Sequence, residues 1–95
     1  MSSVRAPLVV TLYGRAGCHL CDEAAAMLAR ISQRIPLVVT AIDIESDDAL
    51  LERYLFEIPV ICIEGAEIAR APISEAGLEA ALRARPEGPG MSNEQ

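Results

Sequence analysis

Two cysteines separated by two residues, Cys18 and Cys21, lie between a β-branched apolar run and an alanine-rich segment. The apolar run, residues 8–13, is typical of a strand, and the segment after Cys21 is typical of a helix. Cysteines three positions apart in the first turn of a helix lie on one face, close enough to form a disulfide without distorting the backbone. The amide donors and partial positive charge of the helix start also favour the thiolate of Cys18. This spacing predicts a redox-active pair in a strand–loop–helix unit.

Length and composition limit the fold and the partners. A chain of 95 residues without an internal repeat has room for one domain. Hydrophobic residues make up 52% of the chain and aromatic residues only 3%, so we expect an aliphatic core of the α/β type. The formal net charge of −6 argues against nucleic acids and anionic membrane surfaces as partners.

The pattern of apolar stretches and cysteines bears on the compartment. The apolar stretch after residues 1–5 is interrupted by Thr11 and is too short for the core of a signal peptide, and no stretch approaches transmembrane length. Three cysteines in a chain without an export signal suit a reducing compartment. In such a compartment a C-x-x-C pair is more often catalytic or metal-binding than structural. We therefore expect a cytoplasmic protein.

Hydrophobic periodicity predicts the order of the elements. Residues 8–13 are almost continuously apolar, as in a strand that helices cover on both faces. Apolar positions from Ala24 to Ile35 recur every three or four residues and predict an amphipathic helix, which Pro36 ends. The expected elements are a strand at 8–13, a helix at 18–34, a second buried strand at 37–42, a short helix capped by residues 46–48 and ending near 54, a third strand at 60–63, a fourth strand at 67–71, and a last helix behind the N-cap Ser74.

The connections predict the topology. A strand, a helix and a strand in this order imply a parallel, right-handed crossover, and residues 64–66 are typical of the tight turn of an antiparallel hairpin. We expect one α/β domain over residues 1–85, with the order βαβαββα and a central four-stranded mixed sheet flanked by helices. Residues 86–95 carry too little apolar surface to offset their ordering entropy, so we expect a disordered tail.

This arrangement resembles the minimal thioredoxin fold and, more closely, the glutaredoxin family, over roughly residues 8–85. Residues 10–21, Val-Thr-Leu-Tyr-Gly-Arg-Ala-Gly-Cys-His-Leu-Cys, are similar to the glutaredoxin strand and active-site loop. Tyr13 stands at the family's aromatic position and Arg15 where a lysine is usual. Ile58-Pro59 falls where the family has its cis-proline, and residues 64–68 resemble the hairpin that follows. The resemblance implies a thiol–disulfide oxidoreductase.

The expected chemistry is thiol–disulfide exchange between Cys18, Cys21 and a substrate disulfide. Cys18, at the helix start, attacks as a thiolate, and Cys21 resolves the mixed disulfide. This exchange needs no metal or organic cofactor.

Four further residues are candidate substrate contacts. The resemblance implies that Ile58 and Pro59 present their backbone to the bound substrate chain, in the manner of a strand. Arg15 is a candidate because of its position in the family motif, with ordinary loop solvation as the alternative. His19 lies between the cysteines, and a solvated surface histidine is the simplest account of it.

Two other functions stay open at this point. The cysteine pair could instead hold a metal or, through dimerisation, an iron–sulfur cluster for transfer, although a zinc site needs four ligands and only His19 and Cys62 remain. The chain could also be a thioredoxin-fold interaction module whose cysteines cycle slowly. Cys62 lies in an apolar strand, and we expect it to be a buried, inert core residue.

Departures from the glutaredoxin pattern bear on the partner. The family's Cys-Pro-Tyr-Cys is replaced by Cys-His-Leu-Cys, its Thr-Val-Pro by Glu57-Ile-Pro, and its Gly-Gly by Ala69-Arg70. A side chain at Ala69 blocks close backbone approach, and Glu57 repels an anionic ligand. Arg15 and Arg70 are the only evident cations that offset this. We therefore expect a protein or small-molecule disulfide as substrate, weak recognition of glutathione, and a monomer.

Overall fold

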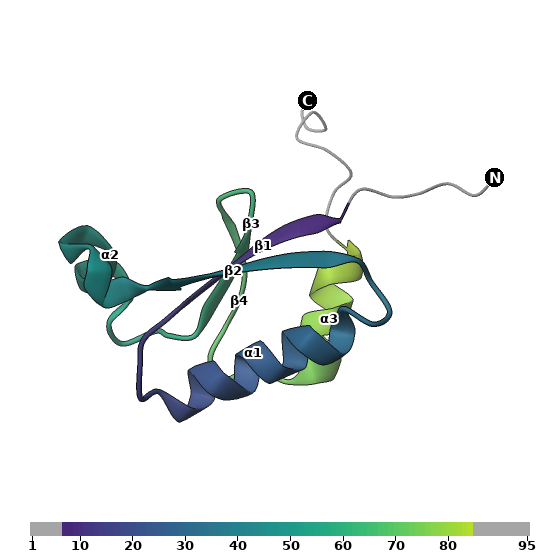
Figure 1. The fold of residues 1–95 in the computed structure, drawn as a ribbon, viewed down its shortest axis with the longest axis horizontal. Coiled ribbons are helices and arrows are strands. Elements are labelled where there is room, and N and C mark those ends of the chain that lie inside the picture. The colour runs from purple at the N-terminus through teal and green to yellow at the C-terminus, as the bar shows by residue number, and fades with distance from the viewer. Residues whose placement is uncertain (1–6, 85–95) are drawn as a thin grey trace.

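The computed structural model describes residues 7–84, and its elements follow the expected order (Figure 1). The elements are β1 (Leu8–Gly14), α1 (His19–Ile31), β2 (Leu37–Asp43), the 3₁₀ turn η1 (Ile44–Ser46), α2 (Asp48–Tyr54), β3 (Val60–Ile63), β4 (Ala66–Arg70) and α3 (Glu75–Ala84). The expected disordered tail, residues 86–95, lies outside the described residues.

β1 lies inside a four-stranded mixed sheet with the strand order β2-β1-β3-β4. It pairs in parallel with β2 along its whole length, so that Gly14 lies opposite Asp43. On its other side it pairs antiparallel with β3, where Tyr13 lies opposite Val60. The expected α/β class, the four-stranded mixed sheet and the parallel pairing of the first two strands are confirmed.

The hairpin of β3 and β4 closes through a two-residue turn. Its central residues, Glu64 and Gly65, have φ angles of 53° and 83°. Two positive φ angles in succession are typical of a type I′ turn, whose twist matches that of the flanking strands. Because only two residues form the turn, β4 begins at Ala66, one residue before the expected start.

One face of the sheet carries the main core, under α1 and α3, which lie on the same side (Figure 1). The apolar stripes of both helices pack against alternate residues of β1 and β3, as the periodicity predicts. The buried residues of this cluster are Val10, Leu12, Ala24, Leu28, Ile31, Ile61, Ile63, Leu78 and Leu82. Burial of one such Leu or Ile side chain contributes about 1.5–3 kcal/mol, so this layer is the principal source of stability.

The opposite face carries a second, smaller cluster near α2, formed by Ile44, Tyr54, Val60 and Cys62. Tyr54 stacks on Tyr13 of β1, with 4.9 Å between the ring centroids. The seven residues of α2 span about 10 Å as a helix, whereas the seven of β1 span about 23 Å as a strand. Val9 at the far end of β1 therefore stays 54% exposed. The expectation that helices cover both faces of the first strand therefore holds at Tyr13 and is wrong at Val9.

β2 is an edge strand, and its expected burial is also wrong. No strand of the described chain pairs with its outer side. Val39, beside Val10 on the face of α1 and α3, remains 39% exposed because these helices pack mainly over β1 and β3. Val38, beside Val9 on the other face, remains 47% exposed because the short α2 does not cover this part of the sheet. A continuous apolar run indicates a strand, but it does not distinguish a central strand from an edge strand when the helical layer is narrow.

Polar side chains set the helix starts largely as the sequence predicts. Asp47 caps α2, and its Oδ1 accepts hydrogen bonds from two backbone amides of that helix. Ser46, expected in the same cap, lies instead in the preceding 3₁₀ turn. Ser74 precedes α3, and its Oγ accepts a hydrogen bond from the amide of Gly77. α1 ends at Ile31, three residues before the expected end, and a turn leads from it to β2.

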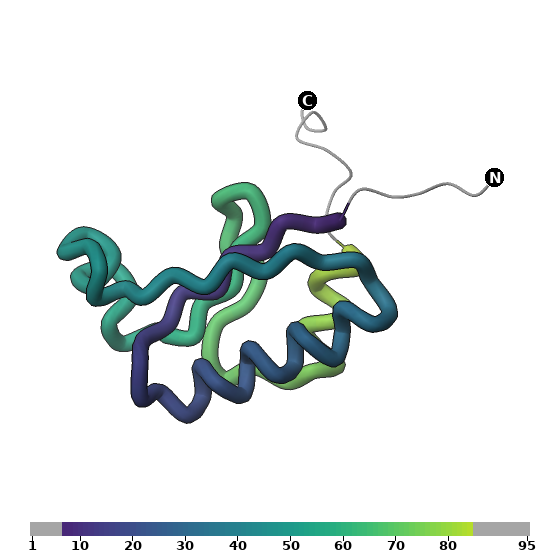
Figure 2. The backbone as a smooth tube through the Cα atoms, viewed as in Figure 1, coloured from purple at the N-terminus to yellow at the C-terminus, as the bar shows by residue number. Residues whose placement is uncertain are grey.

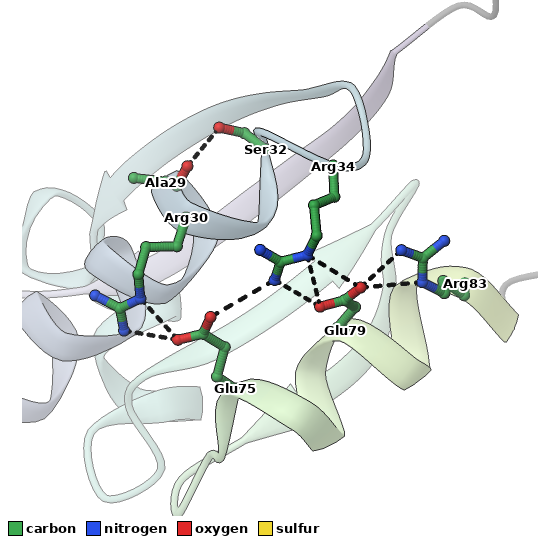
Figure 3. A network of polar contacts seen from close by, with 7 residues as sticks. All are labelled: Ala29, Arg30, Ser32, Arg34, Glu75, Glu79 and Arg83. Carbon is green, nitrogen blue, oxygen red and sulfur yellow. Dashed lines mark hydrogen bonds and ion pairs between the residues drawn. The ribbon is translucent and has the colours of Figure 1, made fainter.

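Arginine–glutamate pairs join α1 to α3 (Figure 3). The guanidinium of Arg30 lies 2.7 Å from Glu75, and that of Arg34 lies 2.6 Å from Glu79. Arg83, one turn further along α3, binds the same Glu79 carboxylate at 2.7 Å. Hydrogen bonds from Arg34 and Arg83 lower the pKa of Glu79 to about 2. These pairs are exposed, so they stabilise the fold weakly, but they neutralise the charge of this part of the surface.

Replacing Glu79 tests this network. Because the folded-state pKa of Glu79 is lowered, its contribution to stability is present above its ordinary pKa near 4.5 and is lost as the pH falls towards about 2. Glu79→Gln should lower the melting temperature slightly at pH 7, and the gap to the wild type should close between pH 4.5 and 2. Circular dichroism melts at a series of pH values measure this. Glu52→Gln, which removes a carboxylate that makes no ion pair among residues 7–84, is the matched control. A difference in melting temperature that persists at pH 2 would show that the ionised Glu79 carboxylate is not the cause.

Candidate functional site

The pairing of the strands gathers the candidate site residues at one end of the sheet. β1 and β2 are parallel, so both end there, at Gly14 and Asp43. β3 is antiparallel to β1 and begins there, directly after Pro59. β4 ends there at Arg70, opposite Val60. Figure 2 shows the connection from β1 to α1 and the connection from α2 to β3 at this same end of the molecule.

Cys18 and Cys21 form a disulfide at the start of α1, with their Cα atoms 5.2 Å apart. Cys18 is the N-cap residue of the helix, and its Sγ accepts a hydrogen bond from the amide of Cys21 at 3.1 Å. In the reduced protein the same amide and the positive end of the helix favour a thiolate at Cys18. Cys21 is buried at 6% exposure, whereas Cys18 is only partly buried. An incoming sulfur therefore reaches Cys18 more readily than Cys21.

Gly14 holds the end of β1 against Cys21. A Cβ atom at this position would lie 2.9 Å from the Cys21 Sγ and 3.1 Å from its Cβ. Only glycine lets the strand and the cysteine approach this closely. The sequence marks Gly14 as part of a loop, but in the structure it is the last residue of β1. The sequence signal for this contact is a glycine directly after an apolar strand and a few residues before a C-x-x-C pair.

Two hollows flank the first turns of α1. The larger, of about 260 Å³, lies between α1 and the ends of β1 and β2 and is lined by Leu12, Gly14, Arg15, Cys21, Ala41 and Asp43 among others. The smaller, of about 80 Å³, lies on the side of β3 and β4 and is lined by Leu20, Glu23, Met27, Pro59, Pro72 and Ile73 among others. We call the smaller one the proline groove. It places Pro59 beside the residues between the two cysteines.

The Ile58-Pro59 peptide bond is cis, as the resemblance implies. The carbonyl of Pro59 accepts a hydrogen bond from the amide of Ala71 at 3.1 Å, which ties the start of β3 to the segment after β4. A second cis bond, Ala71-Pro72, lies in that segment and was not expected from the sequence. Nothing in the local sequence distinguishes it, since most X-Pro bonds are trans. The contact of Ile58 with substrate stays a prediction.

Arg15 and His19, the two polar candidates of the cysteine loop, pair with nearby carboxylates. The guanidinium of Arg15 lies 3.4 Å from Glu45, and both side chains are exposed. The Nε2 of His19 lies 2.8 Å from Glu23 one turn further along α1, and the histidine side chain is 82% exposed. His19 is thus a surface residue, as expected. Substrate binding by either residue stays a prediction.

Arg70 is held by two carboxylates. It lies 2.9 Å from Glu57 and donates hydrogen bonds to Glu67. The hydrogen bond with Glu67 is the main cause of a raised pKa at Arg70, and it lowers the pKa of Glu67 in turn. The two residues expected to oppose each other in ligand binding, Glu57 and Arg70, therefore neutralise one another.

Cys62 lies apart from the site, in the second core cluster. It is a free cysteine with 3% exposure, and burial is the main cause of its raised pKa. The expectation of a buried core residue is confirmed. Within residues 7–84, no group of three or more histidine, cysteine or acidic side chains is placed to hold a metal ion. No helix in this part of the chain is long and apolar enough to cross a membrane.

Comparisons with known proteins identify the family of the chain. The family model described as "Glutaredoxin-like domain (DUF836)" matches residues 9–83. A solved structure of protein XcR50 from X. campestris is 35% identical, with a TM-score of 0.72, and the match covers 81% of this chain and 99% of that one. Protein Ne2328 from Nitrosomonas europaea is 27% identical, with a TM-score of 0.73 and coverages of 84% and 96%.

A more distant match concerns the fold alone. Thioredoxin 1 from Thermosipho africanus TCF52B is 16% identical, with a TM-score of 0.60, and the match covers 80% of this chain and 91% of that one. At this identity the match shows a common fold and nothing further. Because the family model spans nearly all of the described residues, the chain belongs to the glutaredoxin-like domain family (DUF836) and has a thioredoxin-like fold.

Proposed function

We propose that this protein is a thiol–disulfide oxidoreductase that cycles between a Cys18/Cys21 dithiol and the corresponding disulfide. The observation that carries the proposal is the N-cap position of Cys18, whose Sγ accepts the amide hydrogen bond of Cys21 while Cys21 itself is buried. This arrangement provides an accessible, stabilised thiolate and a shielded second thiol, which are the two parts that a dithiol exchange needs.

The exchange proceeds in two substitutions at sulfur. The Cys18 thiolate attacks one sulfur of the substrate disulfide, forms a mixed disulfide, and releases the other substrate sulfur as a thiolate that takes up a proton. Cys21 then loses its proton and attacks the Cys18 Sγ, which releases the second substrate thiol. Two electrons pass from the dithiol to the substrate, and the Cys18–Cys21 disulfide remains. An external thiol or dithiol reduces it, which suits a reducing compartment such as the cytoplasm.

The proline groove is the proposed place for the substrate chain. Leu20, between the cysteines, and Pro59 both line it, so a chain that lies there runs past the cysteine loop. Pro59 has no amide hydrogen to donate, and Ile58 would present its backbone to an extended substrate segment as a strand does. Arg15 lies on the other flank of α1, beside Cys21.

Glutathione is an unfavourable electron donor on electrostatic grounds. Its two carboxylates need nearby cations or amides, and Arg70 is already bound by Glu57 and Glu67. Arg15 is paired with Glu45. Each pair would have to open before its arginine could bind a carboxylate of the tripeptide, and this lowers the affinity. A protein or a small neutral dithiol avoids that cost.

Single cysteine replacements test the proposed exchange. Cys18→Ser should lower the turnover of a protein disulfide by at least about 100-fold, because the attacking thiolate is lost. Cys21→Ser should leave the first attack intact and accumulate a mixed disulfide, visible as an added mass on a non-reducing gel. Cys62→Ala, which removes the buried cysteine of the core, is the control and should turn over at the wild-type rate. Unchanged steady-state turnover in Cys21→Ser would rule out the two-cysteine route.

The choice of electron donor gives a second test. In a coupled assay on the same disulfide substrate, we expect kcat/KM with glutathione to be at least about tenfold lower than with a thioredoxin-reductase system, about 1.4 kcal/mol in transition-state binding. Arg15→Ala should change the glutathione rate little, since Arg15 is engaged by Glu45. Fast, saturable turnover with glutathione that collapses in Arg15→Ala would show instead that Arg15 leaves Glu45 to bind the tripeptide.

A further inference from the structure

The cysteine end of the molecule carries carboxylates that no cation neutralises. Five acidic side chains there make no ion pair among residues 7–84: Asp22, Asp43, Asp47, Asp48 and Glu52. Asp22 and Asp43 line the same hollow as Cys21, and the other three belong to the start and middle of α2, which lies at this end of the sheet (Figure 1). Arg53 of α2 lies over the ring of Tyr54 and makes no ion pair among residues 7–84, so the unpaired carboxylates outnumber the unpaired arginine and the field at this end is negative.

The opposite end of the helical layer is neutralised. There Arg30, Arg34 and Arg83 pair with Glu75 and Glu79, so that each carboxylate has at least one arginine (Figure 3). Residues 7–84 carry twelve carboxylates and six arginines, a formal charge of −6, and this charge thus acts mainly at the cysteine end. Such an uneven distribution steers charged partners towards that end, within about 10 Å at 0.1 M salt.

Two large apolar side chains are exposed at the same end. Phe56 lies three residues before Pro59 and is 93% exposed. Leu20 lies between the cysteines, is 51% exposed and lines the proline groove. An exposed aromatic ring costs little entropy to order and supplies much contact area when a partner covers it. Phe56, and Leu20 with the proline groove, are thus apolar contact points at the end of the molecule that carries the unpaired carboxylates.

We propose that the substrate is a disulfide within a polypeptide segment of net positive charge, which packs apolar side chains against Leu20 and Phe56. This inference rests on the proposed exchange at Cys18. Charge complementarity selects the occupant, because an acidic or neutral segment would gain nothing from the unpaired carboxylates at this end of the molecule. The covalent step is the one described above: the dithiol supplies two electrons and two protons, and the substrate leaves with two thiols.

A single-turnover measurement tests the charge preference without an electron donor. The full chain is reduced, freed of reductant, and mixed with two disulfide-bonded peptides that differ only in flanking lysines or glutamates. At low ionic strength the lysine peptide should be reduced at least about tenfold faster in second-order rate constant than the glutamate peptide. In about 1 M NaCl, where the screening length falls to about 3 Å, the two rate constants should converge.

Matched variants locate the effect on the surface. Asp48→Asn/Glu52→Gln removes two charges of α2, at the cysteine end of the molecule, and should reduce the preference for the lysine peptide by about threefold or more. Gln33→Lys/Ala80→Lys shifts the net charge by the same amount at two exposed positions away from the cysteine loop, one in the turn after α1 and one in α3. This double variant should keep most of the preference. Circular dichroism verifies that both double variants are folded.

A second pair of variants tests the apolar part of the surface. Phe56→Ser should slow the reduction of both peptides, because the partner loses its aromatic contact. Val38→Thr, which removes exposed apolar surface near the start of the edge strand β2, should slow neither.

The outcomes separate the two levels of the proposal. If the protein reduces both peptides at equal rates at low salt, or if the two double variants behave alike, the cationic substrate is wrong while the exchange stands. If it reduces neither peptide and does not reduce hydroxyethyl disulfide, the proposed exchange itself is wrong and the inference is wrong with it.

Discussion

The pairing of β1 with a parallel strand on one side and an antiparallel strand on the other is the constraint on which the site depends. Together with the pairing of β3 and β4, it places the ends of β1, β2 and β4 and the start of β3 at one end of the sheet. The cysteine loop and Pro59 lie at that same end. The main core beneath α1 and α3 keeps this arrangement rigid, since alternate residues of β1 and β3 are buried in it. A precise position for two sulfur atoms therefore follows from hydrogen bonds and apolar packing elsewhere in the fold.

The two cysteines differ in accessibility because Cys18 caps the helix while Cys21 packs against the end of β1. Cys18 caps α1 and stands where backbone amides of the first turn point outward, so its sulfur receives a hydrogen bond and stays partly accessible. Cys21 lies one turn inside, against Gly14, where a larger residue would collide with its sulfur. One turn of helix thus separates an attacking group from a resolving group, with no other side chain required to distinguish them.

Much of this could be predicted from the sequence, because the relevant patterns are local. The C-x-x-C spacing, the apolar stripe of α1, the cap residues Asp47 and Ser74 and the hairpin turn each depend on residues within a few positions of one another. The wrong predictions concern which parts of the sheet the helices cover. The apolar run of β2 predicts a buried strand, yet the strand lies at the edge with Val39 exposed, since α1 and α3 pack mainly over β1 and β3. The short α2 likewise leaves Val9 and its neighbour Val38 exposed on the other face.

By itself the sequence determined the order of the elements, the fold class and the identity of the reactive pair, because periodicity, capping and cysteine spacing act over one or two helical turns. Only the tertiary structure decided which charged side chains form ion pairs and which do not. Asp22 and Asp43, which line the hollow beside Cys21, make no ion pair within residues 7–84. Arg70 of β4 pairs with Glu57 of the loop before β3, and Arg34 of the turn after α1 pairs with Glu79 of α3. These pairings join residues far apart in the chain, and no local pattern specifies them, because the free energy of an ion pair depends on distance in space.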